Sequence, residues 1–302
     1  MSARVRAVVG IERTVSDLAR TEAFYRDGLG FARIGPPEPV PPPVLQAFGL
    51  PDAAATRLTM RLGDQRIGFL AFDPPGAPYP DAPCATDPFF QHAAIPVRDM
   101  DAAFAHLSAA GPGAISVGGP QTLPPDSGGV TAYKFRDPDG HPLELIVFPG
   151  GPPAERWRGA RGLFLGIDHS AITVTDRAAA LAFYGDRLGL AVAQRGVNRG
   201  EGQARLDGVP DPVVDVIALE PTGAATPHVE LLHYRCPMSA RPRPAAFGPR
   251  DRATTRFVLA VEDAPETAAA IRAAGYPARV SADGSTAYAE GPDGRGLLLV
   301  AS

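Results

Sequence analysis

Two histidines of this chain begin predicted strands, and the strand face of the first is otherwise apolar. His92 opens the stretch HAAIPV and shares a strand face with Ala94. His169 opens HSAITV in the same register. A glutamate follows each histidine in a later predicted strand, Glu144 in HPLEL and Glu230 in HVELL. A single histidine at a strand start is usually structural. Its recurrence with a matching glutamate indicates a shared chemical role, since imidazole is both a proton carrier and a metal ligand.

The elements that must position these residues recur four times along the chain. Each unit has a short alternating strand, an aspartate, a helix and then about three more strands. The DPDG and GPDG sequences are typical of hairpin turns between such strands. Similar units at regular intervals indicate an internal repeat. Each marker aspartate can also cap the helix that follows it. The four markers are Asp17, Asp99, Asp176 and Asp263.

The units alternate in type, which predicts a duplication of a duplication. The first and third carry Phe-Tyr and then Leu-Gly in their helices, whereas the second and fourth end their helices on Ala-Ala-Gly. We therefore predict an α+β protein with two domains of two modules each. The first domain spans 1–150, with modules at about 5–75 and 88–149, and the second spans 163–302, with modules at about 163–236 and 252–301.

The phrases VSDLARTEAFYRDGLGF and KFRDPDGHPLELIVF resemble the vicinal oxygen chelate superfamily. This superfamily includes glyoxalase I, extradiol dioxygenases and the fosfomycin and bleomycin resistance proteins. The resemblance covers nearly the whole chain in the four-module form, and its motifs are specific for the fold and not for the reaction. It implies paired βαβββ modules that form two glyoxalase-like domains, with curved mixed sheets enclosing a cup. A divalent metal in that cup would be bound by the first and last strands of each module.

The resemblance also implies which residues bind the metal. Modules one and four lack ligand types at these positions, where they have Gly10, Gly68, Arg256 and Leu298. Fused four-module glyoxalases, which this chain resembles, form one site from the two middle modules and another from the outer two. The expected result is one metal site between modules two and three and a degenerate outer site. The expected metal ligands are His92, Glu144, His169 and Glu230.

Two imidazoles and two carboxylates suit one divalent ion, whether Zn, Ni, Co, Mn or Fe(II), with positions left for substrate or water. Such an ion polarises a carbonyl or enolate oxygen as a Lewis acid. By the same resemblance, Glu144 or Glu230 would be the catalytic base that moves a proton beside the carbonyl. The leading hypothesis is a glyoxalase-type lyase or isomerase that acts on a small carbonyl-containing substrate.

Two other functions stay open at this point. An Fe(II) extradiol-type ring-cleaving dioxygenase needs a face of two histidines and one carboxylate. That hypothesis requires one glutamate off the metal, and four-module relatives of that type keep their ligands in modules three and four, unlike this chain. A metal-free protein that binds an antibiotic or a metabolite would keep the fold and use the same four residues as a polar lining.

The candidate substrate contacts come from strands and polar loops near the expected ligands. Tyr133 and Lys134 lie opposite the strand of Glu144, and the register decides which of the two side chains points into the cup. His228 shares a strand face with Glu230. Glycine-rich polar segments of modules two and three add further candidates, which are Gln121, Asn198 and Gln203.

Composition limits the possible partners and the compartment. The chain has 302 residues, a net charge of −4 and an isoelectric point near 5.9, so it has no basic footprint for nucleic acid. No apolar run approaches the length of a membrane span. The two cysteines, Cys84 and Cys236, fall in different halves, which favours a reducing cytoplasm. We expect a small-molecule substrate and a monomer or homodimer, since fused modules can pair within one chain.

Overall fold

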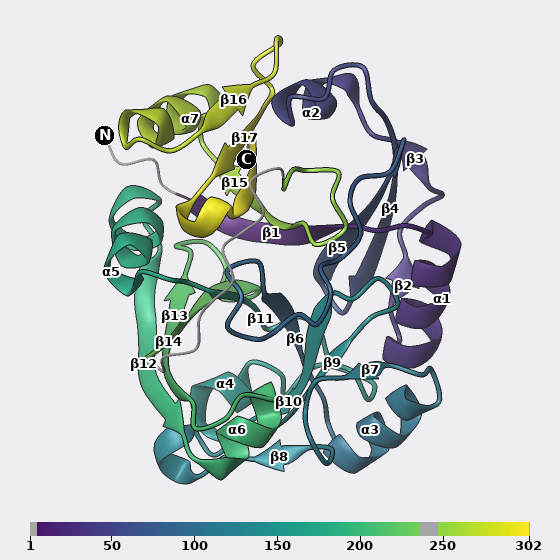
Figure 1. Ribbon diagram of the computed structural model, residues 1–302, viewed down its shortest axis with the longest axis vertical. Coiled ribbons are helices and arrows are strands. Elements are labelled where there is room, and N and C mark those ends of the chain that lie inside the picture. The colour runs from purple at the N-terminus through teal and green to yellow at the C-terminus, as the bar shows by residue number, and fades with distance from the viewer. Residues whose placement is uncertain (1–4, 236–246, 302) are drawn as a thin grey trace.

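The computed structural model describes residues 5–235 and 247–301. Cys236 and Ser302, the last residues of predicted module three and of the second predicted domain, lie outside the described residues. The described chain forms two mixed sheets with helices placed between and around them, which confirms the α+β fold (Figure 1). Among the described residues, no helix is long and apolar enough to cross a membrane.

Sheet A is built from the strands of modules one and four. Its order is β16-β17-β18-β15-β1-β5-β4-β2, with β3 also paired to β4. The strands of module one are β1 (Val5–Thr14), β2 (Ala32–Arg33), β3 (Glu38–Pro39), β4 (Ala54–Leu62) and β5 (Gln65–Asp73). Those of module four are β15 (Thr255–Val261), β16 (Ala278–Val280), β17 (Thr286–Glu290) and β18 (Gly296–Ala301).

Sheet B is built from the strands of modules two and three. Its order is β12-β13-β14-β11-β6-β10-β9-β7, with β8 also paired to β9. The strands of module two are β6 (Gln91–Pro96), β7 (Gly113–Ala114), β8 (Gln121–Thr122), β9 (Thr131–Arg136) and β10 (Pro142–Val147). Those of module three are β11 (His169–Thr173), β12 (Ala191–Arg199), β13 (Val213–Glu220) and β14 (His228–Tyr234).

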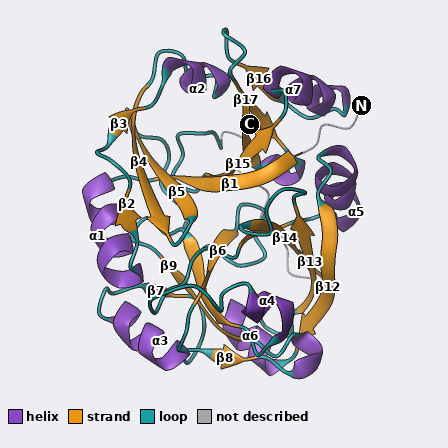
Figure 2. Cartoon of the chain, turned by 180° about the vertical axis from the view of Figure 1, so that it is seen from behind, coloured by secondary structure: helices purple, strands orange, loops and turns teal. Residues whose placement is uncertain are grey.

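The helices cover the sheets and close their ends. Each module has one helix directly after its first strand: α1 (Leu18–Leu29), α3 (Met100–Ser108), α5 (Arg177–Ala180), continued by the π-helical turn η2 (Leu181–Arg187), and α7 (Ala264–Ala273). The remaining helices are α2 (Pro42–Ala47), α4 (Gly151–Glu155) and α6 (Glu201–Asp207), with 3-10 turns η1 (Pro125–Ser127) and η3 (Pro292–Gly294). Figure 2 shows α1 and α3 along one side of the molecule, and α4 and α6 near the end of sheet B.

The four marker aspartates cap their helices, as the sequence predicts. Each lies in an extended conformation before the first helical residue, and its carboxylate accepts hydrogen bonds from backbone amides of the first turn. Asp17, for example, accepts from the amides of Ala19 and Arg20. Such a bond satisfies an amide that has no partner within the helix. All four modules therefore turn from strand to helix by the same local chemistry.

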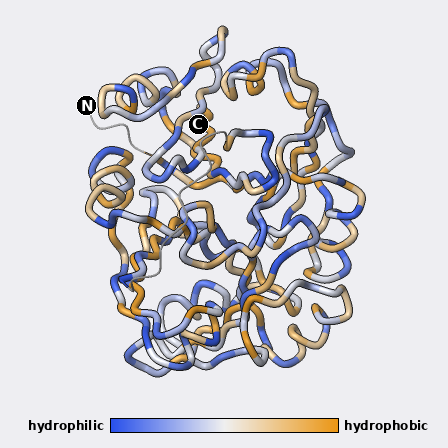
Figure 3. The backbone as a smooth tube through the Cα atoms, viewed as in Figure 1, coloured by the Kyte–Doolittle hydropathy of each residue, from blue (hydrophilic) through white to orange (hydrophobic). Residues whose placement is uncertain are grey.

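Each sheet combines one module from each half of the chain. The antiparallel pair β1–β15 joins modules one and four in sheet A, and the pair β6–β11 joins modules two and three in sheet B. The main hydrophobic core packs residues of all four modules, and apolar segments alternate with polar ones along the chain (Figure 3). The first strands of modules two and three therefore lie side by side in the middle of sheet B.

Candidate metal centre

The register of sheet B brings the four expected ligands to one face. On β6 and β11, His92 lies opposite Ala171 and His169 lies opposite Ala94. The outer neighbours complete two rows across the sheet: Glu144 of β10 lies beside Ala94, and Glu230 of β14 lies beside Ala171. Because side chains alternate along a strand, these histidines and glutamates all project to the same side. The hydrogen-bonded register alone therefore creates a cluster of potential metal ligands.

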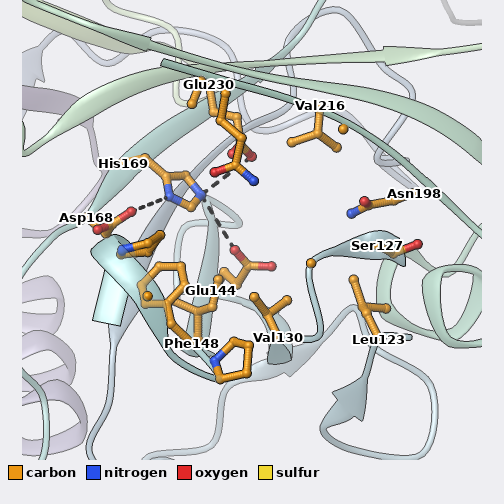
Figure 4. Close-up of a pocket in the computed structure, with 18 of the residues that line it drawn as sticks. Leu123, Ser127, Val130, Glu144, Phe148, Asp168, His169, Asn198, Val216 and Glu230 are labelled. Carbon is orange, nitrogen blue, oxygen red and sulfur yellow. Dashed lines mark hydrogen bonds and ion pairs between the residues drawn. The ribbon is translucent and has the colours of Figure 1, made fainter. Parts of the chain in front are cut away.

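The four side chains converge to contact distance. Glu144 Oε2 lies 3.3 Å from His92 Nε2 and 3.7 Å from His169 Nε2. Glu230 Oε1 lies 3.6 Å from the same His169 nitrogen. Ligand atoms of His92, His169 and Glu230 all lie within 4.8 Å of one another. Figure 4 shows His169 between the two glutamates, with its Nε2 facing both carboxylates.

The donor set of this cluster fits a divalent metal. His92 is 1% exposed and His169 is 4% exposed. Neither ring nitrogen of His92 has a hydrogen-bond partner among the described residues, and the same holds for His169 Nε2. Buried polar atoms are normally satisfied, so several unpartnered nitrogens beside carboxylates need an explanation. Imidazole nitrogens and carboxylate oxygens are common ligands for Zn and for other divalent transition metals.

For each of the two histidines, burial lowers the pKa and the neighbouring carboxylates raise it. Burial lowers the pKa of His92 to about 4, although Glu144 opposes this shift. Burial also lowers the pKa of His169, but Glu230, Asp168 and Glu144 outweigh it and raise that pKa to about 9. Burial raises the pKa of Glu144, while His92 and Lys134 lower it to about 2. At neutral pH these shifts leave His92 neutral, Glu144 ionised and His169 protonated, so a metal ion that binds here must displace the His169 proton.

Asp168, directly before His169, orients that ring and was missed by the sequence analysis. Its Oδ2 lies 3.0 Å from His169 Nδ1, and its Oδ1 accepts a hydrogen bond from Trp157 Nε1 at 2.9 Å. This leaves His169 Nε2 directed toward the two glutamates. A carboxylate behind a metal-binding histidine fixes its tautomer and raises its basicity. The Asp-His dipeptide in GIDHS is the only sequence signal for this role, and it is weak.

A cavity of about 630 Å³ opens above the four residues. We call it the middle cup, since modules two and three form most of its lining. One apolar part of its wall comes from the cluster around Leu123, Ile146 and Leu206. Pro152 and Arg156, from the segment between the two halves, also line it. Its volume falls within the range of small-molecule ligand pockets in proteins.

The structure brings four of the six expected substrate contacts to the middle cup. They are Lys134, Asn198, Gln203 and His228, which all line the cavity. Lys134 faces the cup because its β9 position lies beside Glu144 of β10. His228 is buried, 5.3 Å from the His169 ring between centroids, and its Nδ1 has no hydrogen-bond partner among the described residues.

The structure does not bring Tyr133 and Gln121 to the cup. Tyr133 is one residue from Lys134 on β9 and therefore points to the opposite face. Its ring packs in the core, with its centroid 4.8 Å from that of Phe104 and 5.8 Å from that of Phe135. The Gln121 amide instead donates to the carbonyls of Val117 and Gly119 within its own loop. The register therefore selects Lys134 over Tyr133 for the cup, and the Gln121 amide is engaged within its own loop instead of at the cup.

The equivalent positions in sheet A follow from the same register. Gly10 lies opposite Val258, and Glu12 lies opposite Arg256, on the paired strands β1 and β15. Gly68 of β5 lies beside Glu12, and Leu298 of β18 lies beside Val258. The two sheets therefore match position by position: Gly10 with His92, Gly68 with Glu144, Arg256 with His169, and Leu298 with Glu230.

Protein side chains fill the space above these positions in sheet A, which we call the outer cup. Phe48, after helix α2, packs beside Tyr288 and Leu298 in a separate apolar cluster. Arg256 is fully buried, with its guanidinium 4.7 Å from the centre of the Phe48 ring. Glu12 lies 2.9 Å from Arg57 Nε and 4.0 Å from Arg256 Nη1. A buried cation at the position of His169 disfavours a metal ion there.

The comparison with protein families agrees with this repeat structure. A family profile described as the Glyoxalase/Bleomycin resistance protein/Dioxygenase superfamily matches residues 7–145 and 166–294. The chain belongs to this superfamily. The two matched stretches each span two modules, so the superfamily unit occurs twice. No sequence among the curated proteins matches the chain.

Solved structures of other proteins share the fold over nearly the whole chain. Glyoxalase I from Zea mays has a TM-score of 0.61 and 16% sequence identity, covering 99% of this chain and 92% of that chain. A putative dioxygenase from Bacillus subtilis subsp. subtilis str. 168 also has a TM-score of 0.61, with 13% identity, covering 99% of this chain and 86% of that one. At these identities the likeness establishes the fold, and the reaction must be inferred from the site.

Proposed function

We propose that the protein is a divalent-metal-dependent lyase or isomerase of the glyoxalase type, with one active site in the middle cup. Its substrate would be a small molecule that carries a carbonyl group. The observation that supports this proposal is the convergence of two buried histidines and two glutamates at a ligand-sized cavity, with imidazole nitrogens that face the carboxylates without a hydrogen bond. His92, Glu144, His169 and Glu230 would hold the ion.

The bound metal would act as a Lewis acid and stabilise negative charge on a substrate oxygen. Glu230 is the better placed of the two glutamates to move a proton. Glu144 lies within 4.0 Å of His92, His169 and Lys134, whereas the one such contact of Glu230 among the described residues is His169. The Glu230 side chain is also more exposed, at 17% against 7% for Glu144. Glu230 Oε1 would accept a proton from the carbon beside the carbonyl and return it to the neighbouring carbon.

One observation favours an Fe(II) ring-cleaving dioxygenase as a second candidate. His92, His169 and Glu230 form a compact group of two histidines and one carboxylate, without Glu144. Such a face on Fe(II) leaves positions open for a catechol and for oxygen. Oxygen uptake with catechols separates this activity from the isomerase, which consumes no oxygen.

Metal content per chain tests both enzymatic proposals. The protein is purified without a metal-binding tag, as the wild type and as a His92→Ala, His169→Ala variant. A His106→Ala, His233→Ala variant is the matched control, because these histidines bond to the Asp27 carbonyl and to Asp215, away from the cup. We expect about one ion per chain in the wild type and the control, and none in the first variant. Metal-free wild type, or metal retained without His92 and His169, would instead support a metal-free binding protein.

A further inference from the structure

Asp207, at the end of helix α6, organises the wall of the middle cup beside Glu144. The residue is buried, and its two oxygens accept three hydrogen bonds. Oδ1 accepts from Lys134 Nζ at 2.6 Å. Oδ2 accepts from Gln203 Nε2 at 2.6 Å and from the Tyr234 hydroxyl at 2.8 Å. One carboxylate therefore fixes side chains from β9, α6 and β14, and it balances the charge of Lys134.

This arrangement determines which atoms remain for a ligand. An ionised carboxylate only accepts hydrogen bonds, so the Gln203 amide nitrogen must face Asp207 and its Oε1 must point elsewhere. Gln203 is 3% exposed and lines the cavity, and its Oε1 has no hydrogen-bond partner among the described residues. Lys134 also lines the cavity, and it has three N–H donors, of which Asp207 takes one. An unsatisfied acceptor and a donor therefore lie on the same wall.

We propose that Lys134 and Gln203 form a polar subsite for a neutral hydroxyl or carboxamide group of the substrate. This inference rests on the proposed function, because it concerns the substrate class of that same active site. A hydroxyl or carboxamide can accept a hydrogen bond from the Lys134 ammonium and donate one to Gln203 Oε1. A buried acceptor that gains a donor recovers the cost of its lost hydration, which is the basis of strong discrimination between substrates.

The charges around the subsite disfavour a carboxylate there. Asp207 already lies 2.6 Å from the Lys134 nitrogen, and Glu144 Oε1 lies 4.0 Å from it. A substrate carboxylate would add a third anion around one cation, and it would face Gln203 Oε1 with acceptors only. The subsite therefore selects a neutral group that both donates and accepts.

The neighbouring wall indicates what connects this group to the reacting carbonyl. Leu123, Ile146 and Leu206 form an apolar cluster with Ala132, whose β9 position is two residues from Lys134. An apolar or aromatic body would bury its surface against this wall. The substrate class is then a carbonyl compound with an apolar body and a hydroxyl or carboxamide substituent.

A series of benzohydroxamates tests this inference, since the hydroxamate binds divalent metals and the ring would lie against the apolar wall. Dissociation constants are measured by calorimetry on the metal-containing protein. The probes are benzohydroxamate and its ortho, meta and para derivatives with a hydroxyl, a carboxamide or a carboxylate. At one ring position we expect the hydroxyl or carboxamide to tighten binding about tenfold relative to the parent compound, and the carboxylate to weaken it.

Variants assign that gain to the subsite. In Gln203→Leu the ratio of Kd values between the parent and the substituted compound should fall to about one. Gln46→Leu, at a glutamine that contacts Ala282 far from the cup, should keep the tenfold ratio. A Lys134→Met, Asp207→Asn variant removes the buried ion pair as a unit, which avoids leaving one unpaired charge, and it should also abolish the gain.

The outcomes separate this inference from the proposed function. If the parent binds but no hydroxyl or carboxamide derivative binds more tightly, or if a carboxylate binds best, the subsite is refuted while the metal site stands. A tenfold gain that persists in Gln203→Leu also refutes the subsite. If the wild type holds no metal and does not bind the parent, the proposed function fails and the subsite fails with it.

Discussion

The middle and outer cups are built on the same strand register but have opposite contents. In sheet B the four matched positions hold two histidines and two glutamates around an open cavity. In sheet A they hold two glycines, an arginine and a leucine, and the space above them is filled. The difference shows that the scaffold supplies geometry only. The side chains decide whether a cup becomes a binding site or a part of the core.

Packing explains why the outer cup is filled. Protein interiors are close-packed, and an empty apolar cavity costs stability roughly in proportion to its volume. A cup without ligands for a metal or substrate has no functional reason to stay open. In sheet A, Phe48 and Arg256 occupy this space, and Glu12 covers Gly68, where an added Cβ would lie 2.9 Å from Glu12 Cγ. The following four predictions test this contrast, from the largest expected effect to the smallest.

Arg256→Ala should lower the free energy of unfolding by about 3–5 kcal/mol, because it empties a large, fully buried side-chain volume and leaves Glu12 with Arg57 as its near counter-ion. The loss of the hydrogen bonds to Thr14 and to the Pro249 carbonyl adds to this effect. Denaturant unfolding measures the change, and metal content should match that of the wild type. A variant with the wild-type free energy of unfolding but without metal would mean that the outer cup takes part in metal binding.

Phe48→Ala should destabilise the protein by about 3–4 kcal/mol, since the side chain is 2% exposed and its removal leaves a cavity. Phe148→Ala is the matched substitution in the middle cup, where the partly buried ring lines an open pocket. The loss there should be less than about 2 kcal/mol, because solvent can occupy the vacated space. Thermal unfolding of both variants gives the comparison. Equal losses would contradict the distinction between a filled cup and an open one.

Asp168→Asn should weaken metal binding by about 10–100-fold, because it removes the charged acceptor behind His169. The matched position in sheet A is Thr255, which precedes Arg256 as Asp168 precedes His169. The Thr255 hydroxyl contacts His141 Nδ1. Thr255→Val should therefore leave metal affinity at the wild-type value. Competition with a chromophoric chelator measures both. Wild-type affinity in Asp168→Asn would show that the geometry of His169 does not depend on this carboxylate.

Replacing any one marker aspartate by alanine should cost about 1 kcal/mol, the usual value for a helix N-cap. The expected loss is similar for Asp17, Asp99, Asp176 and Asp263, because each caps its helix in the same way. Urea unfolding of the four single variants is the measurement. A loss confined to modules two and three would mean that the shared scaffold is not equally important in both cups.

Much of this structure was predictable because it depends on local patterns. The marker aspartates, the strand that precedes each and the turns between later strands follow from capping, alternation and turn chemistry, and the structure confirms these elements. The positions of His92, His169, Glu144 and Glu230 within their strands were also predictable. Their role as metal ligands remains a prediction, although the structure places them at contact distance.

Tertiary structure decided the features that depend on residues far apart in the sequence. The register of β9 placed Lys134 in the cup and Tyr133 in the core. The sequence pattern shows that neighbouring side chains point to opposite faces, but it does not show which of the two faces the cup. Asp207 and Lys134 are paired only because α6 of module three packs beside β9 of module two. Sequence by itself therefore determined the repeat, the caps and the types of residue available for chemistry. Which strands pair, which cup is filled and which polar groups meet were determined by long-range packing, because those choices depend on contacts that no local pattern encodes.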